Sequence, residues 1–427
     1  MKLTDMKNLL AGGALEARLA EVYGADAVDA QRARYLAAID SFAALYGEGR
    51  DVSLFSVSGR SELSGNHTDH NHGCVVAASI NLDIIAVASA NADNVIRVKS
   101  EGFSADAVDI TAYTAPDPAL YATSASIIAG MSAQFAANGY TTGGFDTYST
   151  SNVLKGSGIS SSAAFEDMIG NILNYLYNDG KVDNVEIAKM SQKAENLFFG
   201  KPCGLMDQVA CAHGGIVAID FADPSSPVIR GVPFDITGAG YALCIVNTGG
   251  NHADLTDDYA SIPAEMKAVA AHFGKKVLRE VDEADVIAAI PTLREKLGDR
   301  AILRALHFFA ENKRVLAQTE ALMSDDLDAF LGHVCASGQS SFCYLQNIYT
   351  TKAPDEQGLS LALCLAERVL SGKKAAWRVH GGGFAGTIQA FVPVEYVPEF
   401  RAAMDGALGE GACLALHIRQ IGACKIA

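Results

Sequence analysis

The chain has 427 residues, of which 49% are hydrophobic and 19% charged, and its formal net charge is −16 at pH 7. A chain of this length and composition is expected to fold into two well-packed domains without disordered tails. Its acidic surface makes nucleic acid and anionic membranes improbable partners.

The cysteines and the first residues favour a reducing cytoplasm. Nine cysteines are scattered without C-x-x-C spacing, which argues against a disulfide framework or a zinc ribbon. The first residues lack the charged-then-apolar pattern of a signal peptide. The most apolar stretch, 74–90, contains Asn81 and Asp83 and is too polar and too short to span a bilayer. We therefore expect a cytoplasmic protein.

Helices and strands are expected to follow one another without a regular rhythm. The first fifty residues are Ala-rich and place apolar side chains at helical spacing, for example Leu15, Leu19 and Val22. Further predicted elements are strands at 52–57, 75–88, 95–98 and 145–154 and helices at 124–138, 161–177 and 185–199. This mixture favours an α+β fold over a doubly wound sheet.

The polar segment 59–73 follows directly on the apolar run 52–57. It reads Gly-Arg-Ser-Glu-Leu-Ser-Gly-Asn-His-Thr-Asp-His-Asn-His-Gly. A strand that runs into a tight polar loop could hold a small polar ligand through many hydrogen bonds; a His-rich surface turn is the alternative. Its histidines, His67, His70 and His72, match no familiar zinc pattern.

A Gly/Ser-rich turn is predicted between the strand at 145–154 and the next helix. It reads Gly156-Ser157-Gly158-Ile159-Ser160-Ser161-Ser162-Ala163-Ala164. Glycines let the backbone approach a ligand, and a helix start presents unpaired N–H groups and a positive dipole end. Capping needs only one serine, so the run predicts a phosphate site, although no Lys-Ser/Thr completes a Walker P-loop.

Two carboxylates near residue 200 are candidates for chemistry. Glu195 lies near the C-terminal end of the helix predicted at 185–199, where the dipole disfavours negative charge, so we expect a compensating cation. Asp207 follows a Pro/Gly turn among apolar neighbours, which predicts partial burial. A buried Asp is either satisfied by backbone N–H groups or functional, and the pattern leaves both open.

The second half of the chain alternates long helices with short strands. The predicted helices include 301–323 and 357–370, and the predicted strands are 241–247, 375–380 and 387–392. A Pro/Ser-rich connector at 223–227 follows a change of pattern after Gly215. We therefore expect an N-terminal domain of residues 1–218 and a C-terminal domain of residues 219–427.

The segment 381–386, Gly-Gly-Gly-Phe-Ala-Gly, matches G-x-G-x-x-G but lies between two predicted strands. A dinucleotide-binding turn would lead into a helix, and a protein-kinase loop would be accompanied by H-R-D and D-F-G motifs, which the chain lacks. We expect a strand–turn–strand unit whose backbone closely approaches another element or a ligand.

Taken in order, these segments resemble the GHMP small-molecule kinases, and within them the galactokinases. Galactokinases carry G-R-V-N-L-I-G-E-H-T-D-Y-N-x-G, which residues 59–73 resemble. Their G-x-G-L-S-S-S-A-A, C-G-I-M-D-Q and G-x-G-F-G-G motifs are similar to residues 156–164, 203–208 and 381–386. The resemblance covers nearly the whole chain. It implies a two-lobed GHMP kinase fold with the site between the lobes, and phosphoryl transfer from ATP, with Mg²⁺, to the anomeric hydroxyl of a hexose.

The resemblance also implies roles for single residues. Asp207 would accept or orient the proton of the anomeric hydroxyl, and Arg60 would keep that carboxylate ionised. Ser162 and Glu195 would be the Mg²⁺ ligands. The implied sugar contacts are Asn66, His67, Asp69, Gly204 and Tyr259, and the implied nucleotide contacts are Gly156, Ser157, Gly158, Ser160, Ser161 and Ser162.

The chain departs from the galactokinase pattern mainly on the sugar side. Asn66 stands where the family has a Glu that is expected to accept a hydrogen bond from a sugar hydroxyl near C6. A neutral Asn can donate as well as accept, so it would tolerate a carboxylate or an amide. Ile262-Pro263 replaces two arginines, whereas Leu154 and Ala385 are milder changes.

Galactose is the expected substrate, and two alternatives stay open. The first is a 1-kinase for a C6- or N-modified sugar, such as galacturonate or N-acetylgalactosamine. The second is a non-catalytic sensor of sugar and ATP, as some galactokinase relatives are. The complete run 160–164 and the presence of Asp207 favour the enzyme.

Overall fold

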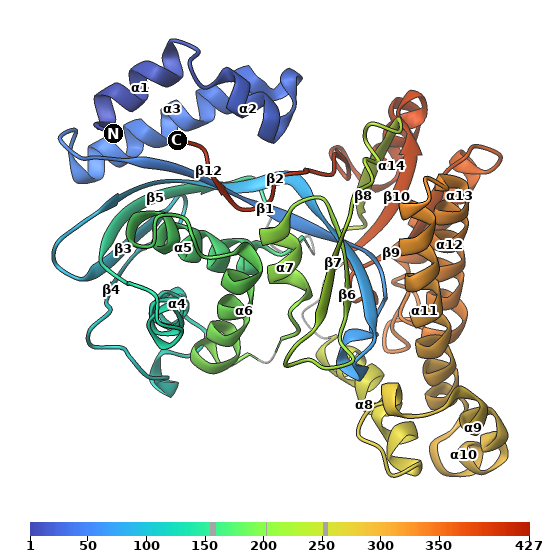
Figure 1. Ribbon diagram of the computed structural model, residues 1–427. Helices are drawn as coiled ribbons and strands as arrows, with labels where there is room; N and C mark the ends of the chain where they lie inside the picture. The colour runs from blue at the N-terminus through green and yellow to red at the C-terminus, as the bar shows by residue number, and fades with distance from the viewer. Residues whose placement is uncertain (154–158, 202, 251–254) are drawn as a thin grey trace.

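The computed structural model describes residues 1–153, 159–201, 203–250 and 255–427. Within these ranges the strands form two sheets, one of eight strands and one of four, and helices pack on both (Figure 1). The α+β class predicted from the sequence is confirmed. No helix in the same ranges is long and apolar enough to cross a bilayer.

The larger sheet is built mainly from the first half of the chain. Its strand order is β12-β1-β2-β5-β3-β4, with β6 paired to β2 and β7 paired to β6. The strands are β1 (Ser53–Ser64), β2 (Cys74–Ala90), β3 (Val95–Ser100), β4 (Ala105–Asp109), β5 (Phe145–Ser151), β6 (Ile216–Asp220), β7 (Val228–Val232) and β12 (Cys424–Lys425). β1 and β2 are antiparallel, whereas β3 and β5 are parallel.

Helices cover both faces of this sheet (Figure 1). One face carries α1 (Leu3–Ala11), α2 (Glu16–Tyr23) and α3 (Val28–Tyr46), and the other carries α4 (Ser124–Ala137), α5 (Ser161–Tyr177), α6 (Asn184–Ala194) and α7 (Met206–His213). Successive strand residues point to opposite faces. Leu54 therefore packs in the N-terminal helical layer, while Phe55 and Val57 lie in the core on the other side.

The smaller sheet belongs to the second half and has the order β11-β8-β10-β9. Its strands are β8 (Tyr241–Asn247), β9 (Ala376–His380), β10 (Thr387–Pro393) and β11 (Cys413–Leu416). The helices of this half are α8 (Thr256–His272), α9 (Glu283–Ala288), α10 (Ile290–Leu297), α11 (Asp299–Met323), α12 (Leu327–Ser340), α13 (Gly358–Leu370) and α14 (Val397–Leu408). Leu243 and Ile245 of β8 join the core of the first lobe, whereas Cys244 and Val246 pack with α13 and α14. The apolar core is therefore continuous between the lobes.

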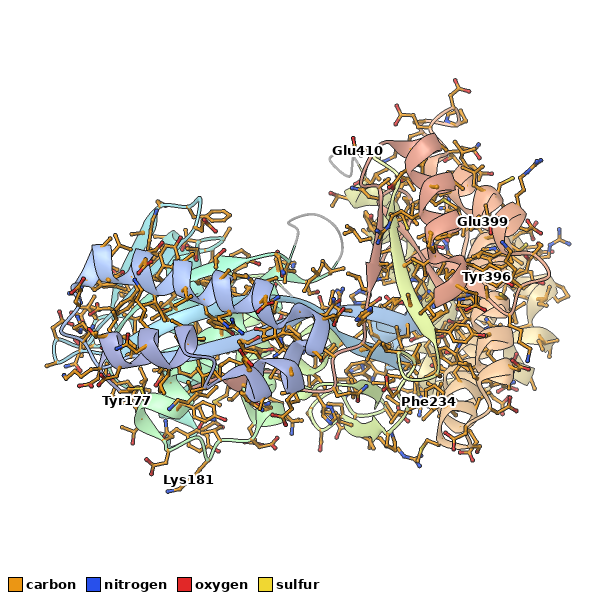
Figure 2. All side chains as sticks on the ribbon, turned by 90° about the horizontal axis from the view of Figure 1, so that it is seen from above. Tyr177, Lys181, Phe234, Tyr396, Glu399 and Glu410 are labelled. Atoms are coloured by element: carbon orange, nitrogen blue, oxygen red, sulfur yellow. The ribbon has the colours of Figure 1, made fainter. Side chains whose placement is uncertain are left out.

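The first sheet extends past the domain boundary predicted at 218/219. The predicted boundary at 218/219 falls inside β6, and the β6–β7 hairpin extends the first sheet to Val232. β12 then returns to pair with β1. Composition could not show this, because a strand's sheet is decided by its pairing partner. Figure 2 shows the two lobes side by side, with Tyr177 and Lys181 on one and Tyr396 and Glu399 on the other.

β1 is longer than predicted and carries two irregularities. The strand expected at 52–57 continues to Ser64, so the polar segment begins as strand and becomes a loop only at Gly65. Its register with β2 shifts between Ser58 and Arg60 and again between Glu62 and Ser64. Bulges of this kind bend a strand and redirect its side chains, often beside active sites.

Candidate active site

Arg60 of β1 and Asp207 of α7 form a partly buried ion pair, in which the Asp207 side chain keeps 34% of its exposure. The Nε and Nη2 atoms of Arg60 lie 2.8 and 2.7 Å from Oδ1 of Asp207. Asp207 lies in the first turn of α7, where free N–H groups and the helix dipole favour a negative charge. Its Oδ2 accepts a hydrogen bond from the hydroxyl of Ser160. The fold thus joins three of the predicted site residues.

This environment keeps Asp207 ionised. Burial raises the pKa of a carboxyl group, but Arg60, together with the Ser160 hydroxyl and Lys201, outweighs burial and lowers the pKa of Asp207 below its usual value. Burial likewise lowers the pKa of Arg60, and Asp207 more than reverses that effect. An ionised carboxylate held in this way can accept a proton from a hydroxyl group placed beside it.

The start of α5 lies against the same pair. The N–H of Arg60 donates to the carbonyl of Ile159 at 3.2 Å. The close approach needs a glycine at position 59, since a Cβ there would lie 2.9 Å from the same carbonyl oxygen. Ser160 precedes α5 in a left-handed conformation, and Ser161 and Ser162 begin the helix, with Ser162 exposed. The predicted contacts Gly156, Ser157 and Gly158 lie outside the described residues.

Two more carboxylates converge on Gln208. Its Nε2 donates to Glu166 at 3.0 Å and to Glu195 at 2.9 Å. Burial, followed by the nearby charge of Glu195, raises the pKa of Glu166 well above its usual value. Nζ of Lys201 lies 3.0 Å from Glu195, so an ammonium group supplies the compensating cation that the sequence predicted there.

Local structure presents Glu195 at an irregular helix end. α6 stops at Ala194, and Glu195–Phe199 form a π-helical turn, where the sequence predicted continuous α-helix. Such turns recur at functional sites. Glu166 was absent from the sequence candidates, although it follows Ser162 by four residues and therefore shares its face of α5.

The donor atoms around Gln208 fit a hard divalent cation. Mg²⁺ is commonly bound by one or two carboxylates together with phosphate oxygens and water. Glu166 and Glu195 supply carboxylates, and Oε1 of Gln208 is buried with no hydrogen-bond partner in the described part of the chain. Within that part no three His, Cys, Asp or Glu side chains gather as a metal site. Phosphate oxygens would therefore have to complete the coordination.

Three predicted sugar residues donate to consecutive carbonyls of the glycine turn between β9 and β10. Nδ2 of Asn66 donates to Gly381 at 2.7 Å, Nε2 of His67 to Gly382 at 2.8 Å, and the Tyr259 hydroxyl to Gly383 at 2.8 Å. The segment 381–386 is thus the predicted strand–turn–strand unit, and its backbone approaches another element. It draws the loop of the first lobe and α8 of the second together.

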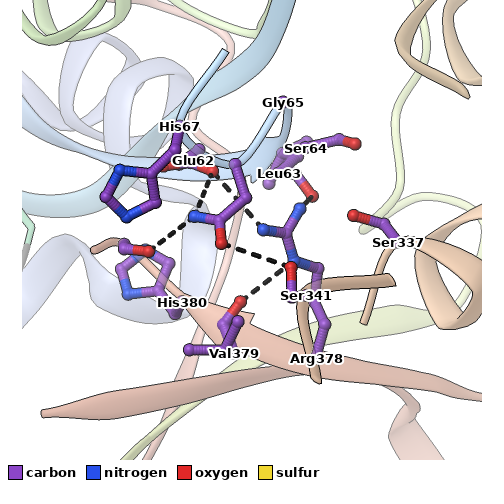
Figure 3. A network of polar contacts seen from close by, with 12 residues as sticks. Glu62, Leu63, Ser64, Gly65, His67, Ser337, Ser341, Arg378, Val379 and His380 are labelled. Atoms are coloured by element: carbon purple, nitrogen blue, oxygen red, sulfur yellow. Dashed lines mark hydrogen bonds and ion pairs between the residues drawn. The ribbon is translucent and has the colours of Figure 1, made fainter. Parts of the chain in front are cut away.

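The side chain of Asn66 is fully engaged by the protein. Besides Gly381, its Nδ2 donates to Oε1 of Glu62 at 3.3 Å, and its Oδ1 accepts from Asn347 at 2.8 Å and from Ser341 at 3.2 Å. These contacts use both amide hydrogens and both oxygen lone pairs. Figure 3 shows the network that includes Glu62 and Ser341. A sugar contact through Asn66 would require one of these bonds to break.

His67 and Asp69 belong to the same polar loop, and Gly204 lies against it. Burial lowers the pKa of His67, so its ring is neutral near pH 7. The carboxylate of Asp69 approaches the backbone at Gly204, where a Cβ would lie 3.0 Å from Oδ2. Because Gly204 closely precedes Asp207 in the chain, this contact places the loop beside the Arg60–Asp207 pair.

Glu311 of α11 anchors the start of the loop and was absent from the sequence candidates. Its Oε1 accepts hydrogen bonds from the Ser64 hydroxyl at 3.2 Å, the Gly65 N–H at 3.1 Å and the Ser337 hydroxyl at 2.5 Å. Burial opposes ionisation, but His307 and neighbouring arginines lower the pKa of Glu311 to about 2. A buried carboxylate therefore links β1, α11 and α12.

Comparison with family models gives two matches in the first half. Residues 40–90 match the galactokinase galactose-binding signature, and residues 125–215 match the GHMP kinases N terminal domain. The first match contains Arg60 and the polar loop. The second contains the serine run, Glu195 and Asp207.

Curated relatives are similar along most of the chain. The galactokinase of Streptomyces coelicolor is 31% identical over 376 residues, which cover 86% of this chain and 91% of the relative. That of Actinobacillus pleuropneumoniae serotype 3 is 32% identical over 369 residues, which cover 85% and 91%.

Solved structures confirm the fold. A Lactococcus lactis galactokinase complexed with galactose matches with a TM-score of 0.74 at 24% identity, over 90% of this chain and 98% of its own. A mevalonate kinase matches with a TM-score of 0.61 at 13% identity, over 86% and 99%. The two-lobed GHMP kinase fold predicted from the sequence is correct.

Proposed function

We propose that this chain, which belongs to the galactokinase family of GHMP kinases, transfers the γ-phosphoryl group of ATP to the anomeric hydroxyl of galactose. The products are galactose 1-phosphate and ADP. The observation that carries the proposal is the Arg60–Asp207 ion pair at the start of α7, beside the first turn of α5. A sugar 1-kinase needs an ionised carboxylate and a fixed positive charge where the hydroxyl group meets the phosphate.

Asp207 takes or orients the proton of the anomeric hydroxyl. The sugar oxygen then forms its bond to phosphorus while the bond from phosphorus to the ADP oxygen breaks. Arg60 keeps Asp207 ionised and offsets negative charge near the reacting oxygen. Phosphoryl transfer needs little covalent assistance, so positioning and electrostatics supply most of the rate.

The start of α5 is the place for the ATP phosphates. A helix start presents N–H groups that can bind an anion, and the hydroxyls of Ser161 and Ser162 can contact phosphate oxygens. The predicted contacts at 156–158 come shortly before this helix in the sequence. Ser162 and Glu195, with Glu166 beside them, would hold Mg²⁺. When bound, that ion neutralises phosphate charge.

The sugar lies between the two lobes in this proposal. His67, Asp69 and Gly204 of the first lobe and Tyr259 of the second form its walls, and Asn66 belongs to the same wall. Burial raises the pKa of Tyr259 to about 12, so its hydroxyl keeps its proton. We place the enzyme in the cytoplasm, where its thiols stay reduced.

A panel of sugars with MgATP and detection of ADP tests the proposal. Galactose is expected to give the highest kcat/KM, with galacturonate and N-acetylgalactosamine well below it. Turnover of galacturonate without turnover of galactose would contradict the proposal. Binding of sugar and ATP without any turnover would instead identify the chain as a sensor.

A further inference from the structure

Glu62 lies on the same face of β1 as Arg60. The two residues are separated by one position, and the pairing with β2 is regular between them, from Arg60 opposite Ser79 to Glu62 opposite Ala77. The two bulges of β1 lie immediately before and after this pair. Since Arg60 is directed at Asp207, Glu62 is directed at the same side of the strand.

The carboxylate of Glu62 is held on one oxygen. Oε1 accepts from Asn66 at 3.3 Å and lies 3.4 Å from Nη2 of Arg378. Oε2 has no protein partner in the described ranges, and it is not sealed from solvent, because the side chain keeps 10% of its exposure. One oxygen is therefore anchored, and the other remains open to a ligand.

Several charged side chains act on Glu62. Burial raises the pKa of Glu62. The positive charges of Arg378 and Arg60 lower that pKa, whereas the negative charge of Asp69 raises it further. The charges that act on Glu62 thus include Arg60 and Asp69. The proposed function places Arg60 near the reacting oxygen and Asp69 in the wall of the sugar site.

Glu62 and Asn66 exchange the positions of two residues in the galactokinase pattern. That pattern has Asn in the fourth place of G-R-V-N-L-I-G-E and Glu in the eighth, whereas this chain has Glu62 and Asn66. In the structure the two side chains hydrogen-bond to each other. This site therefore has one amide and one carboxylate in contact, at backbone positions that are reversed relative to the family pattern.

We infer that Glu62 is a specificity-determining residue, whose free carboxylate oxygen accepts a hydrogen bond from a hydroxyl group of the sugar, while Asn66 positions that carboxylate. The inference rests on the proposed function. A fixed negative charge at this place repels a uronate, so Glu62 selects neutral hexoses with a free hydroxyl. Asn66 alone would not exclude a uronate.

The first test compares Glu62→Gln with the wild-type chain, with Glu48→Gln as the control at an exposed turn. Gln keeps the shape and loses the charge, and Glu311 still faces Arg378 after the change. A hydrogen bond to a charged acceptor is worth more than one to a neutral acceptor, so KM for galactose is expected to rise about tenfold or more. KM for ATP, kcat and the thermal midpoint should change little.

A series of monodeoxygalactoses identifies the hydroxyl group. The deoxy sugar that lacks the hydroxyl group bound by Glu62 should bind the wild-type chain weakly. Its affinity should then fall little further in the Glu62→Gln variant. Galacturonate binding should improve in the variant. Restoring the family order with Glu62→Asn plus Asn66→Glu should recover galactose affinity relative to Glu62→Asn alone.

The outcomes separate this inference from the proposed function. Calorimetric titration with galactose gives the affinity even if turnover fails. If the wild-type chain binds galactose and Glu62→Gln binds it equally well, the inference is wrong and the function stands. If Glu62→Gln lowers the affinity for every deoxy sugar equally and also lowers the thermal midpoint, Glu62 has a structural role and the inference is wrong. A wild-type chain that prefers galacturonate would overturn both.

Discussion

Arg60 sets the protonation of Asp207 through a charge less than 3 Å away. Because the pKa of Asp207 is lowered, the carboxylate stays ionised below the pH at which an ordinary Asp takes up a proton. Arg60→Gln removes the main cause of that shift. The acid limb of the kcat/KM profile should therefore move to higher pH, in addition to a loss of rate. If the acid limbs of the wild-type and Arg60→Gln profiles coincide, Arg60 does not lower the pKa of Asp207.

Asp207 itself is expected to matter for turnover and not for nucleotide binding. Asp207→Asn preserves the shape but cannot take a proton, so kcat should fall by roughly 10²- to 10⁴-fold. ATP affinity, measured by calorimetry, should change little because the phosphates bind at α5. Asp179→Asn, at an exposed turn, serves as the control. Near-wild-type turnover in Asp207→Asn would exclude it as the acceptor.

Single residues could be predicted where a family motif contains them, but not where their role depends on hydrogen-bond partners far along the chain. Arg60 and Asp207 became candidates through the motifs that resemble those of galactokinases. The hydrogen bonds of Asn66 were not, because they come from Gly381, Asn347 and Ser341, which lie far along the chain. Glu311 gave a usable signal: with Phe308 and Val315 it lies on the buried stripe of its helix, where a carboxylate requires partners.

Among the elements, the glycine turn at 381–383 has the tightest backbone packing near the site. A Cβ on Gly383, at φ +82°, would lie 2.0 Å from the Asn347 carbonyl oxygen. Gly383→Ala should therefore displace the turn and raise KM for galactose more than KM for ATP. Gly372→Ala is a matched control, since its φ is +76° and nothing lies within 4 Å of the added Cβ. Each substitution costs about 1 kcal/mol of backbone strain. The difference between the two variants therefore measures the effect of the contact with the Asn347 carbonyl.

The junction of β1 with α11 and α12 depends on Glu311. Glu311→Gln leaves Arg314 and Arg378 without a full counter-charge and should lower the free energy of unfolding by about 3 kcal/mol. The pKa of Glu311 is lowered from 4.5 to about 2, so its stabilisation is complete above pH 4.5 and is lost as the pH falls toward 2. Urea unfolding of the wild-type chain and of Glu311→Gln gives the difference in their free energies of unfolding, which should be smaller at pH 3.5 than at pH 7. An equal difference at both pH values would contradict this.

Elements were predicted well where the pattern is local. The strands at 241–247 and 387–392 and the helices at 124–138 and 161–177 agree with the structure within one or two residues. The extension of β1 to Ser64 was missed because its second half is polar but buried, with both faces covered. The π-helical turn at Glu195 was missed because it differs from an α-helix only in its hydrogen bonds.

At the scale of the whole molecule, buried histidines make the fold sensitive to mild acid. Burial lowers the pKa of His380 from 6.5 to about 3 and lowers that of His67 as well. The unfolded chain therefore binds more protons than the folded chain below pH 6.5, and stability falls as the pH decreases from 6.5 toward 3. Urea midpoints measured between pH 7 and pH 4 should decline, and less so in His380→Gln. A flat wild-type series would refute this.

The pairing of β12 with β1 bears on how the molecule is assembled. β1 carries Arg60, yet its outer edge at Phe55 and Ser56 is paired by residues 424–425, which follow the whole second lobe in the sequence. During synthesis that edge stays open while most of the chain emerges, and an open edge can pair with another chain. Such long-range closure is slow and exposes partly folded species to aggregation. We therefore expect refolding yield to fall steeply with protein concentration, well before any loss of native stability.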